Sequence, residues 1–264
     1  MTRRLAAALV ALSLCGVRPD ISAGGVRLQA EDALAQQPTP RSLAPIDLTG
    51  YWISIVTEDW RWRMVTPPKG DYASVPITPA AKKVADAWDP AKDTAAGEAC
   101  RAYGAAAIMR VPGRIHITWQ DDSTLRVDTE AGTQTRLFKF GSSADVAVRP
   151  TVPDRLEGSW QGSSRAEWTI VGGRRGAPPA GGSLQVVTTG LRTGYLRKNG
   201  VPYSANAIVT EYFNRTSEPN GDAWLMVTTV VDDPIYLTGR FVTSSHFKKA
   251  ADGSIWNPGP CEAQ

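Results

Sequence analysis

The sequence has little histidine, few cysteines and no apolar run long enough to cross a membrane. His116 and His246 are the only histidines among 264 residues, and no clustered spacing of the kind that binds zinc surrounds them. The apolar stretch at residues 5–15 is too short for a membrane-spanning helix, and no other segment is apolar for long enough. A histidine-based metal site and a transmembrane segment are therefore not expected.

Strong charge of one sign and the common nucleotide motifs are also missing. The 29 Lys and Arg residues and 26 Asp and Glu residues leave a formal net charge of +3, and the basic residues are scattered along the chain. A nucleic-acid-binding protein usually needs a concentrated basic face, so no nucleic-acid partner is expected. The sequence has no Gly-x-Ser-x-Gly elbow, no Walker A loop and no dinucleotide-binding fingerprint. These absences argue against serine hydrolase, nucleotide-driven and Rossmann chemistry, and no cofactor is expected.

The N-terminus has the pattern of a signal peptide. Arg3 and Arg4 precede the short apolar stretch, and Ala33-Leu34-Ala35 is a suitable cleavage site. We therefore expect a signal peptide at residues 1–35, a linker at 36–46 and one domain with a C-terminal tail at 47–264. The mature protein would be periplasmic or secreted. The alternative is a lipoprotein anchored through Cys15, although Leu14 stands where a small residue normally precedes the lipidated cysteine.

Cleavage would leave two cysteines, Cys100 and Cys261. In an oxidising compartment, an even pair far apart in sequence most simply forms a disulfide, here between a helical insert and the C-terminal tail. A catalytic thiol is the alternative, but neither cysteine lies in a recognisable nucleophile or metal motif.

The chain after residue 47 predicts strands interrupted by one helical region. A long first strand is expected at residues 52–65. Thr78 followed by Pro79 is typical of a helix start, and short helices are expected over residues 79–103. Further strands are expected at 115–120, 124–130, 133–140, 156–168, 183–189, 205–214, 224–231 and 241–248. Roughly 8–10 short strands predict an all-β fold, either an antiparallel barrel or a barrel-like sandwich.

Two resemblances accompany this pattern. The opening Gly50-x-Trp52 strand and the run of strands after it resemble lipocalin-like (calycin) β-barrels, which implies a lipocalin-like barrel. From about residue 80 to 245 the chain also resembles a large group of uncharacterised exported bacterial β-rich proteins, a resemblance that implies no known chemistry. In that group a His commonly stands where this chain has Tyr203, and the loop at 171–181 looks like an insertion. The matching runs include Cys100, 108–112, Arg136, 160–163, 182–189, 200–204, 210–211 and 232–234.

The predicted first strand carries a candidate acid or base. At a period of two residues, Glu58 shares a face with Trp52, Trp60 and Trp62. Desolvation among indoles would raise the pKa of this carboxyl, which suits a general acid or base near neutral pH. Alternatively, Glu58 lies at a barrel mouth, solvated or paired with an arginine.

Glu211 and His116 are further candidates. Glu211 alternates onto an apolar face with Val209 and Phe213, where it either acts as a buried acid or base or pairs with Arg110 or Arg136 in a structural bridge. His116 lies on a polar face, either outside the sheet or lining a wet cavity.

Tyr195 and Tyr203 flank a Gly-containing hairpin at residues 196–202. Their side chains either reach into the mouth of a barrel or are ordinary packing residues.

Three functions fit these observations. The first is binding of a small apolar or aromatic molecule in a Trp-lined barrel cavity. The second is an acid/base enzyme (isomerase, lyase or hydrolase) on such a molecule, with Glu58 or Glu211 transferring the proton and Tyr203 or His116 as partner. The third is an envelope protein with an interaction surface and no small ligand. Nine tryptophans support either a lined cavity or an ordinary core. The candidate ligand-binding residues are Trp52, Trp60, Trp62, Arg110, Trp119, Arg136, Trp160 and Tyr195.

Overall fold

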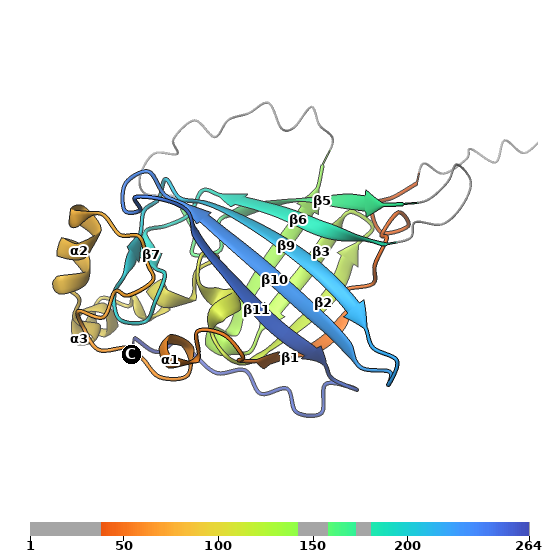
Figure 1. Cartoon of the computed structure of the whole chain (residues 1–264), viewed down its shortest axis with the longest axis horizontal. Coiled ribbons are helices and arrows are strands. Elements are labelled where there is room, and N and C mark those ends of the chain that lie inside the picture. The colour runs from red at the N-terminus through yellow and green to blue at the C-terminus, as the bar shows by residue number, and fades with distance from the viewer. Residues whose placement is uncertain (1–37, 142–157, 173–180, 264) are drawn as a thin grey trace, which may run out of the picture. The chain divides into compact units, whose positions relative to one another are not determined.

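The computed structural model describes residues 38–141, 158–172 and 181–263 (Figure 1). The predicted signal peptide, its cleavage site and Cys15 lie outside the described residues, as do residues 156 and 157 of one predicted strand. No helix in these ranges is long and apolar enough to cross a membrane.

Nine strands of the described chain close into one barrel, in the order β1-β11-β10-β9-β6-β5-β4-β3-β2. This confirms the all-β barrel prediction. Every neighbouring pair is antiparallel except β4 and β5, which run parallel with Phe138 beside Ser164, so the barrel is mixed rather than wholly antiparallel. The strands are β1 (Gly50–Ile55), β2 (Arg114–Asp121), β3 (Thr124–Thr129), β4 (Gln134–Phe140), β5 (Ser163–Val171), β6 (Gly181–Thr189), β9 (Ile208–Ser217), β10 (Ala223–Asp232) and β11 (Phe241–Lys249).

The barrel interior is filled with side chains. In β10 every second residue from Ala223 to Val231 is buried, which is the alternation expected of a strand with one face on a core. Large side chains from opposite walls meet in the centre, and the Phe138 and Phe213 rings lie 5.4 Å apart in an edge-to-face arrangement. Trp52, Phe138, Phe213 and Phe247 are all at most 1% exposed.

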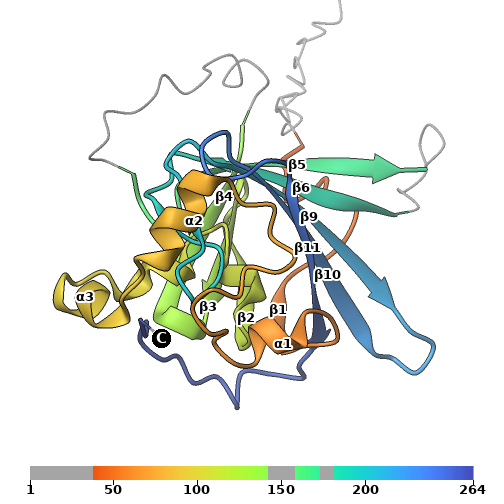
Figure 2. The same cartoon turned by 60° about the vertical axis from the view of Figure 1, so that its left-hand side comes forward.

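Short helices and one hairpin gather at one end of the barrel, which we call the capped end (Figures 1 and 2). As predicted, a helix begins after Thr78, whose hydroxyl accepts a hydrogen bond of 3.1 Å from the Ala81 amide. Asp89 caps the next helix in the same way. The elements are α1 (Trp60–Arg63), α2 (Pro79–Asp86), α3 (Pro90–Ala95), the 3-10 helices η1 (Ala99–Tyr103) and η2 (Ile108–Arg110), and the hairpin strands β7 (Gly194–Tyr195) and β8 (Pro202–Tyr203). A third 3-10 helix, η3 (Ala131–Thr133), joins β3 to β4.

The prediction of one long first strand over residues 52–65 is wrong. β1 ends at Ile55, and the chain turns into α1 because Asp59 adopts a left-handed conformation with φ 52°. The Asp59 carbonyl then accepts hydrogen bonds from the Trp62 and Arg63 amides, which starts the helix. Glu58 is therefore not on a strand face shared with Trp52, Trp60 and Trp62.

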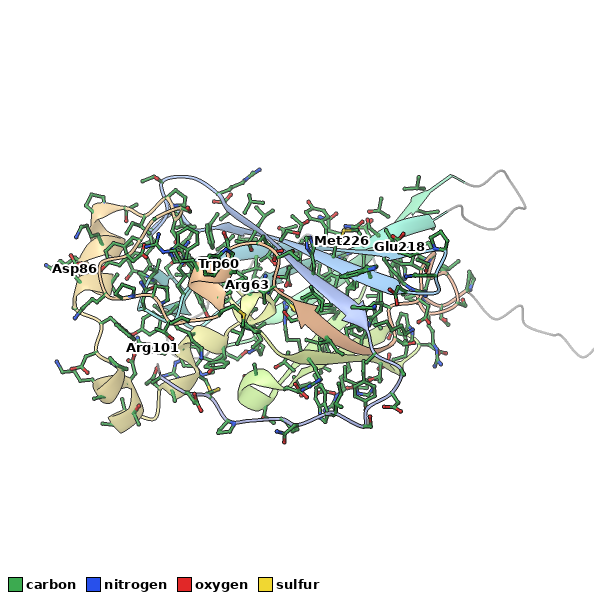
Figure 3. The ribbon with its side chains drawn as sticks, turned by 60° about the horizontal axis from the view of Figure 1, so that its bottom comes forward. Trp60, Arg63, Asp86, Arg101, Glu218 and Met226 are labelled. Atoms are coloured by element: carbon green, nitrogen blue, oxygen red, sulfur yellow. A yellow bond between two sulfur atoms is a disulfide. The ribbon has the colours of Figure 1, made fainter. Side chains whose placement is uncertain are left out.

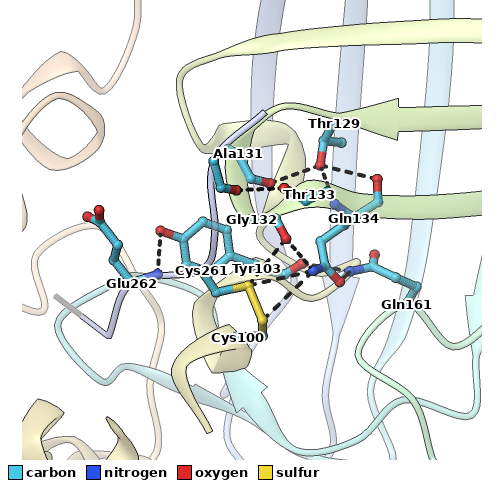
Figure 4. Close-up of a disulfide and its surroundings, with 11 residues drawn as sticks. Cys100, Tyr103, Thr129, Ala131, Gly132, Thr133, Gln134, Gln161, Cys261 and Glu262 are labelled. Carbon is cyan, nitrogen blue, oxygen red and sulfur yellow. Dashed lines mark hydrogen bonds between the residues drawn. A yellow bond between two sulfur atoms is a disulfide. The ribbon is translucent and has the colours of Figure 1, made fainter. Parts of the chain in front are cut away.

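The disulfide between Cys100 and Cys261 is confirmed, with Cα atoms 5.0 Å apart (Figure 4). It joins η1 to the C-terminal tail, which has no helix or strand in residues 250–263. The Gln134 side chain lies over the bond and donates to the Gly132 carbonyl at 2.6 Å. The tail is thereby held along the outside of the barrel.

The end of the barrel opposite the capped end is closed by an aromatic cluster. Trp119, Phe140 and Trp168 lie with ring centroids 5.4–6.5 Å apart. Residues 38–46, interpreted from the sequence as a linker, pack against this end. The Trp168 indole donates to the Pro40 carbonyl, and the Arg41 amide donates to the Asp122 carbonyl.

Candidate functional site

A cavity of about 90 Å³ lies at the capped end, and we call it the mouth pocket. Three segments far apart in sequence line it: residues 62–66 from α1 onward, residues between Ala102 and Val111 from η1 and η2, and hairpin residues 196–198. Its walls combine the Trp62 indole and small aliphatic side chains with three arginines and a lysine. Figure 3 shows Arg63 beside Trp60 on α1 at this end.

Arg197 is the most unusual residue of the mouth pocket. It is 4% exposed, and none of its three guanidinium nitrogens has a hydrogen-bond partner within the described part of the chain. Buried polar groups are nearly always paired, and an unpaired buried charge is strongly unfavourable. Arg197 is also one of the residues that line the cavity, so its buried, unpaired guanidinium is a candidate binding group.

The hairpin that carries Arg197 is held in place from its tip. The Leu196 amide donates to the Val201 carbonyl at 2.7 Å, which closes the turn. The fully buried Asn199 side chain donates to the carbonyls of Pro68 and Asp71 at 3.1 and 2.9 Å. These bonds place the hairpin under the segment that follows α1, and this packing buries Arg197.

Trp62 fixes the position of the Arg197 guanidinium. The guanidinium carbon lies 4.7 Å from the centre of the indole, within the range of a cation–π interaction. The indole nitrogen donates to Asp71 at 3.2 Å, and the same carboxylate oxygen accepts from Arg61 at 2.9 Å. The Arg197 guanidinium is thus held against the Trp62 indole, while its N–H groups have no hydrogen-bond acceptor among the described residues.

Two other arginines of the mouth pocket are already neutralised. The Arg63 side chain forms an ion pair with Glu58 and donates from Nε to the Arg110 carbonyl at 2.9 Å. Arg110 forms an ion pair of 2.8 Å with Asp59 and lies over the Phe241 ring. Burial lowers the pKa of Arg110 to about 10 despite the opposing effect of Asp59, so it stays cationic at neutral pH.

The other hollows of the described chain have fewer buried, unpaired polar groups with which to bind a ligand. A groove of about 430 Å³ beside α2 and α3 is lined by Trp88, Tyr195 and several charged residues. Its central groups are paired with one another, since Asp93 accepts from both Arg101 and Tyr195 at 2.8 Å. Burial and this bond raise the pKa of Tyr195, so its hydroxyl stays protonated.

A second hollow, of about 270 Å³, lies on the outside of the barrel beside His116. The imidazole is stacked on Tyr51 with ring centroids 3.9 Å apart, and Trp256 from the C-terminal tail meets both rings edge-on. His116 is therefore on the outer face, one of the two positions expected, and is remote from the barrel interior.

Glu58 is a partly exposed ion-pair partner, as the alternative interpretation of this residue had it. Besides Arg63, it contacts His246, with the carboxylate 3.2 Å from Nδ1. Of the two α1 tryptophans, Trp60 is 67% exposed and only Trp62 lines the mouth pocket.

Glu211 faces inward, as the alternation in β9 predicted, and pairs with Arg136. Both side chains are fully buried, and two hydrogen bonds of 2.9 and 2.5 Å join them. Thr188 accepts a further hydrogen bond from Arg136 at 3.3 Å. This is the structural bridge considered as an alternative, and it is sealed inside the barrel.

Tyr203 is a packing residue of the hairpin. It is fully buried against Gly104 and Gly194, where any side chain would collide with its hydroxyl. Burial raises the pKa of Tyr203, so the phenol stays neutral.

The remaining predicted ligand-binding residues are spread over the fold. Trp52 is in the core and donates to the Leu48 carbonyl, Trp119 belongs to the opposite aromatic cluster, and Trp160 lies against the Arg192 guanidinium. Of the eight residues predicted to bind a ligand, the structure brings Trp62 and Arg110 together in the mouth pocket.

Sequence reasoning missed Arg63, Arg197 and Lys198. The tyrosines that flank the hairpin at 196–202 were interpreted either as reaching a barrel mouth or as packing residues, but the hairpin residues that line the pocket include Arg197. A basic pair before Asn-Gly resembles an exposed turn, so its burial could not be predicted from the sequence.

No three His, Cys, Asp or Glu side chains among the described residues are arranged to hold a metal ion. The chain matches no protein-family model, no curated protein and no solved structure.

Proposed function

We propose that this is an exported protein that binds a small organic molecule in the mouth pocket. The observation that carries the proposal is a preformed cavity walled by the Trp62 indole and by Ala102, Ala107 and Leu196. Small-molecule sites are typically concave, with polar groups that fix the orientation of the ligand, and here three arginines and a lysine accompany this apolar wall. The disulfide supports export, because such bonds persist in oxidising compartments.

The ligand is expected at the mouth and not in the centre of the barrel. The interior is occupied by Trp52, Phe138, Phe213 and Phe247, so the aromatic residues there act as core. An apolar or aromatic ligand would instead enter from the capped end, where the cavity is open to solvent on one side.

The acid/base enzyme has less support. Glu211 is neutralised by Arg136 inside the barrel, while His116 lies on its outer face and Tyr203 in the hairpin core. These groups do not converge on one cavity.

Titration with benzoate and with benzamide, followed by saturation-transfer NMR and tryptophan fluorescence, tests the proposal. At least one of these aromatic probes should bind, and Trp62→Ala should weaken it about tenfold, since an aromatic contact contributes on the order of 1 kcal/mol beyond its buried area.

Trp60→Ala is the matched control, because it removes an exposed indole from the same short helix. Urea unfolding of both variants checks that they are folded. If neither probe binds, or if Trp60→Ala weakens binding as much as Trp62→Ala, the proposal is wrong.

A further inference from the structure

Counting partners among the described residues, the mouth pocket holds one buried positive charge without a counter-ion. Arg63 is neutralised by Glu58 and Arg110 by Asp59, and Arg61 on α1 is paired with Asp71. Arg197 has no ion pair within the described residues. Lys198 is half-buried with its ammonium over the Tyr103 ring, so water can solvate it.

The acids near Arg197 do not neutralise it directly. Asp59 and Asp71 act on Arg197 electrostatically, but each already has its own arginine, Arg110 and Arg61. Burial outweighs their attraction and lowers the pKa of Arg197. The guanidinium is still charged at neutral pH, because arginine does not lose its proton in proteins.

The free group also has the geometry of a carboxylate receptor. A guanidinium is planar and presents its N–H donors as a fork, which matches the two oxygens of a carboxylate. Here the guanidinium carbon lies 4.7 Å from the centre of the Trp62 indole, and Asn199 fixes the hairpin that carries it. The hairpin itself therefore needs little ordering when a ligand binds.

We infer that the mouth pocket binds a monocarboxylate with a small apolar or aromatic body, and that its carboxylate is seated on Arg197. This inference rests on the proposed function and names its ligand class. One unpaired buried cation matches one negative charge. A dianion would place excess negative charge beside Glu58 and Asp59, and a neutral molecule would leave Arg197 without a partner.

Three probes with the same ring separate these possibilities: benzoate, benzamide and phenylphosphonate in its dianionic form. Benzoate should bind at least tenfold more tightly than benzamide, which corresponds to a charge-assisted hydrogen bond of about 1.5 kcal/mol or more. It should also bind more tightly than phenylphosphonate. Equal affinities of benzoate and benzamide would overturn the inference and leave the proposed function standing. Preferential binding of phenylphosphonate would overturn the single-charge argument, and absence of binding by all three would overturn the proposed function as well.

Arg197→Met tests the assigned residue. It should abolish the preference for benzoate over benzamide while the affinity for benzamide changes little. Arg192→Met is the matched control, because Arg192 also lies over an indole, that of Trp160, but is paired with Glu98 and exposed. It should leave the preference intact, and a loss of preference in both variants would contradict the assignment.

The stability of the unliganded protein gives an independent readout. Because Arg197 is buried and unpaired, Arg197→Met should unfold at the same or a higher urea concentration than the wild type. A marked loss of stability would show that Arg197 is a structural residue and would overturn its assignment as a binding group.

Discussion

Removing the negative charge from the buried Arg136–Glu211 pair should severely destabilise the barrel. Glu211→Gln keeps the size of the side chain but leaves the Arg136 guanidinium without a counter-charge. Both side chains are fully buried, and the nearest additional partner of the guanidinium is Thr188, a neutral hydroxyl at 3.3 Å. Glutamine can replace one hydrogen bond to Arg136 but cannot replace the charge.

The magnitude follows from the burial of the pair. Breaking a buried ion pair on one side typically costs about 3 to 5 kcal/mol, a large part of the roughly 5 to 15 kcal/mol that stabilises a domain. In urea, unfolding followed by tryptophan fluorescence should shift its midpoint down by about 1 to 2 M. Replacing both partners, as in Arg136→Met with Glu211→Leu, should restore most of the loss, because two apolar side chains leave no charge buried.

Asp128→Asn is the control. Asp128 pairs with Arg126 at 2.8 Å on β3, but the Arg126 side chain is 45% exposed, so the substitution should cost less than about 1 kcal/mol. If Glu211→Gln costs no more than Asp128→Asn, or if the double variant is as unstable as the single one, the reasoning from burial and charge is refuted.

Two further results are expected. Replacing Cys100 and Cys261 by alanine should lower the free energy of unfolding by about 2 to 5 kcal/mol, because the disulfide closes a loop with a sequence separation of 161; an unchanged urea midpoint would contradict this. Burial lowers the pKa of His116 below 6.5, so the unfolded chain binds this proton more readily, and stability should fall as the pH drops through and below 6.5. His116→Gln should remove that part of the pH dependence, and an NMR titration midpoint of His116 above 6.5 would refute the assignment.

The sequence by itself determined the strands whose side chains alternate. In β9, the inward positions of Val209, Glu211 and Phe213 follow from a period of two residues, which is a local property of an extended chain. The start of α2 after Thr78 is equally local, because the cap bond spans three residues. The disulfide followed from the number of cysteines that export would leave.

Tertiary structure decided where the regular pattern stops. The sequence predicts one strand over residues 52–65, yet the strand ends at Ile55 and Asp59 turns the chain into a helix. The turn is stabilised by the burial of Arg63, which contacts Glu58 and the carbonyl of Arg110 across the mouth. Neither contact can be inferred from a strand period.

The mouth pocket was likewise decided only by the fold. Trp62 and Arg197 are 135 residues apart in sequence, and they meet because the closed barrel brings the segment after β1 over the hairpin between β6 and β9. From the neighbouring sequence, a basic pair in a turn is expected to be exposed to solvent. Its burial depends on Asn199, which donates hydrogen bonds to carbonyls of the distant segment at Pro68 and Asp71. Local periodicity thus determined the strands, while the candidate site depends on contacts between distant segments that only barrel closure creates.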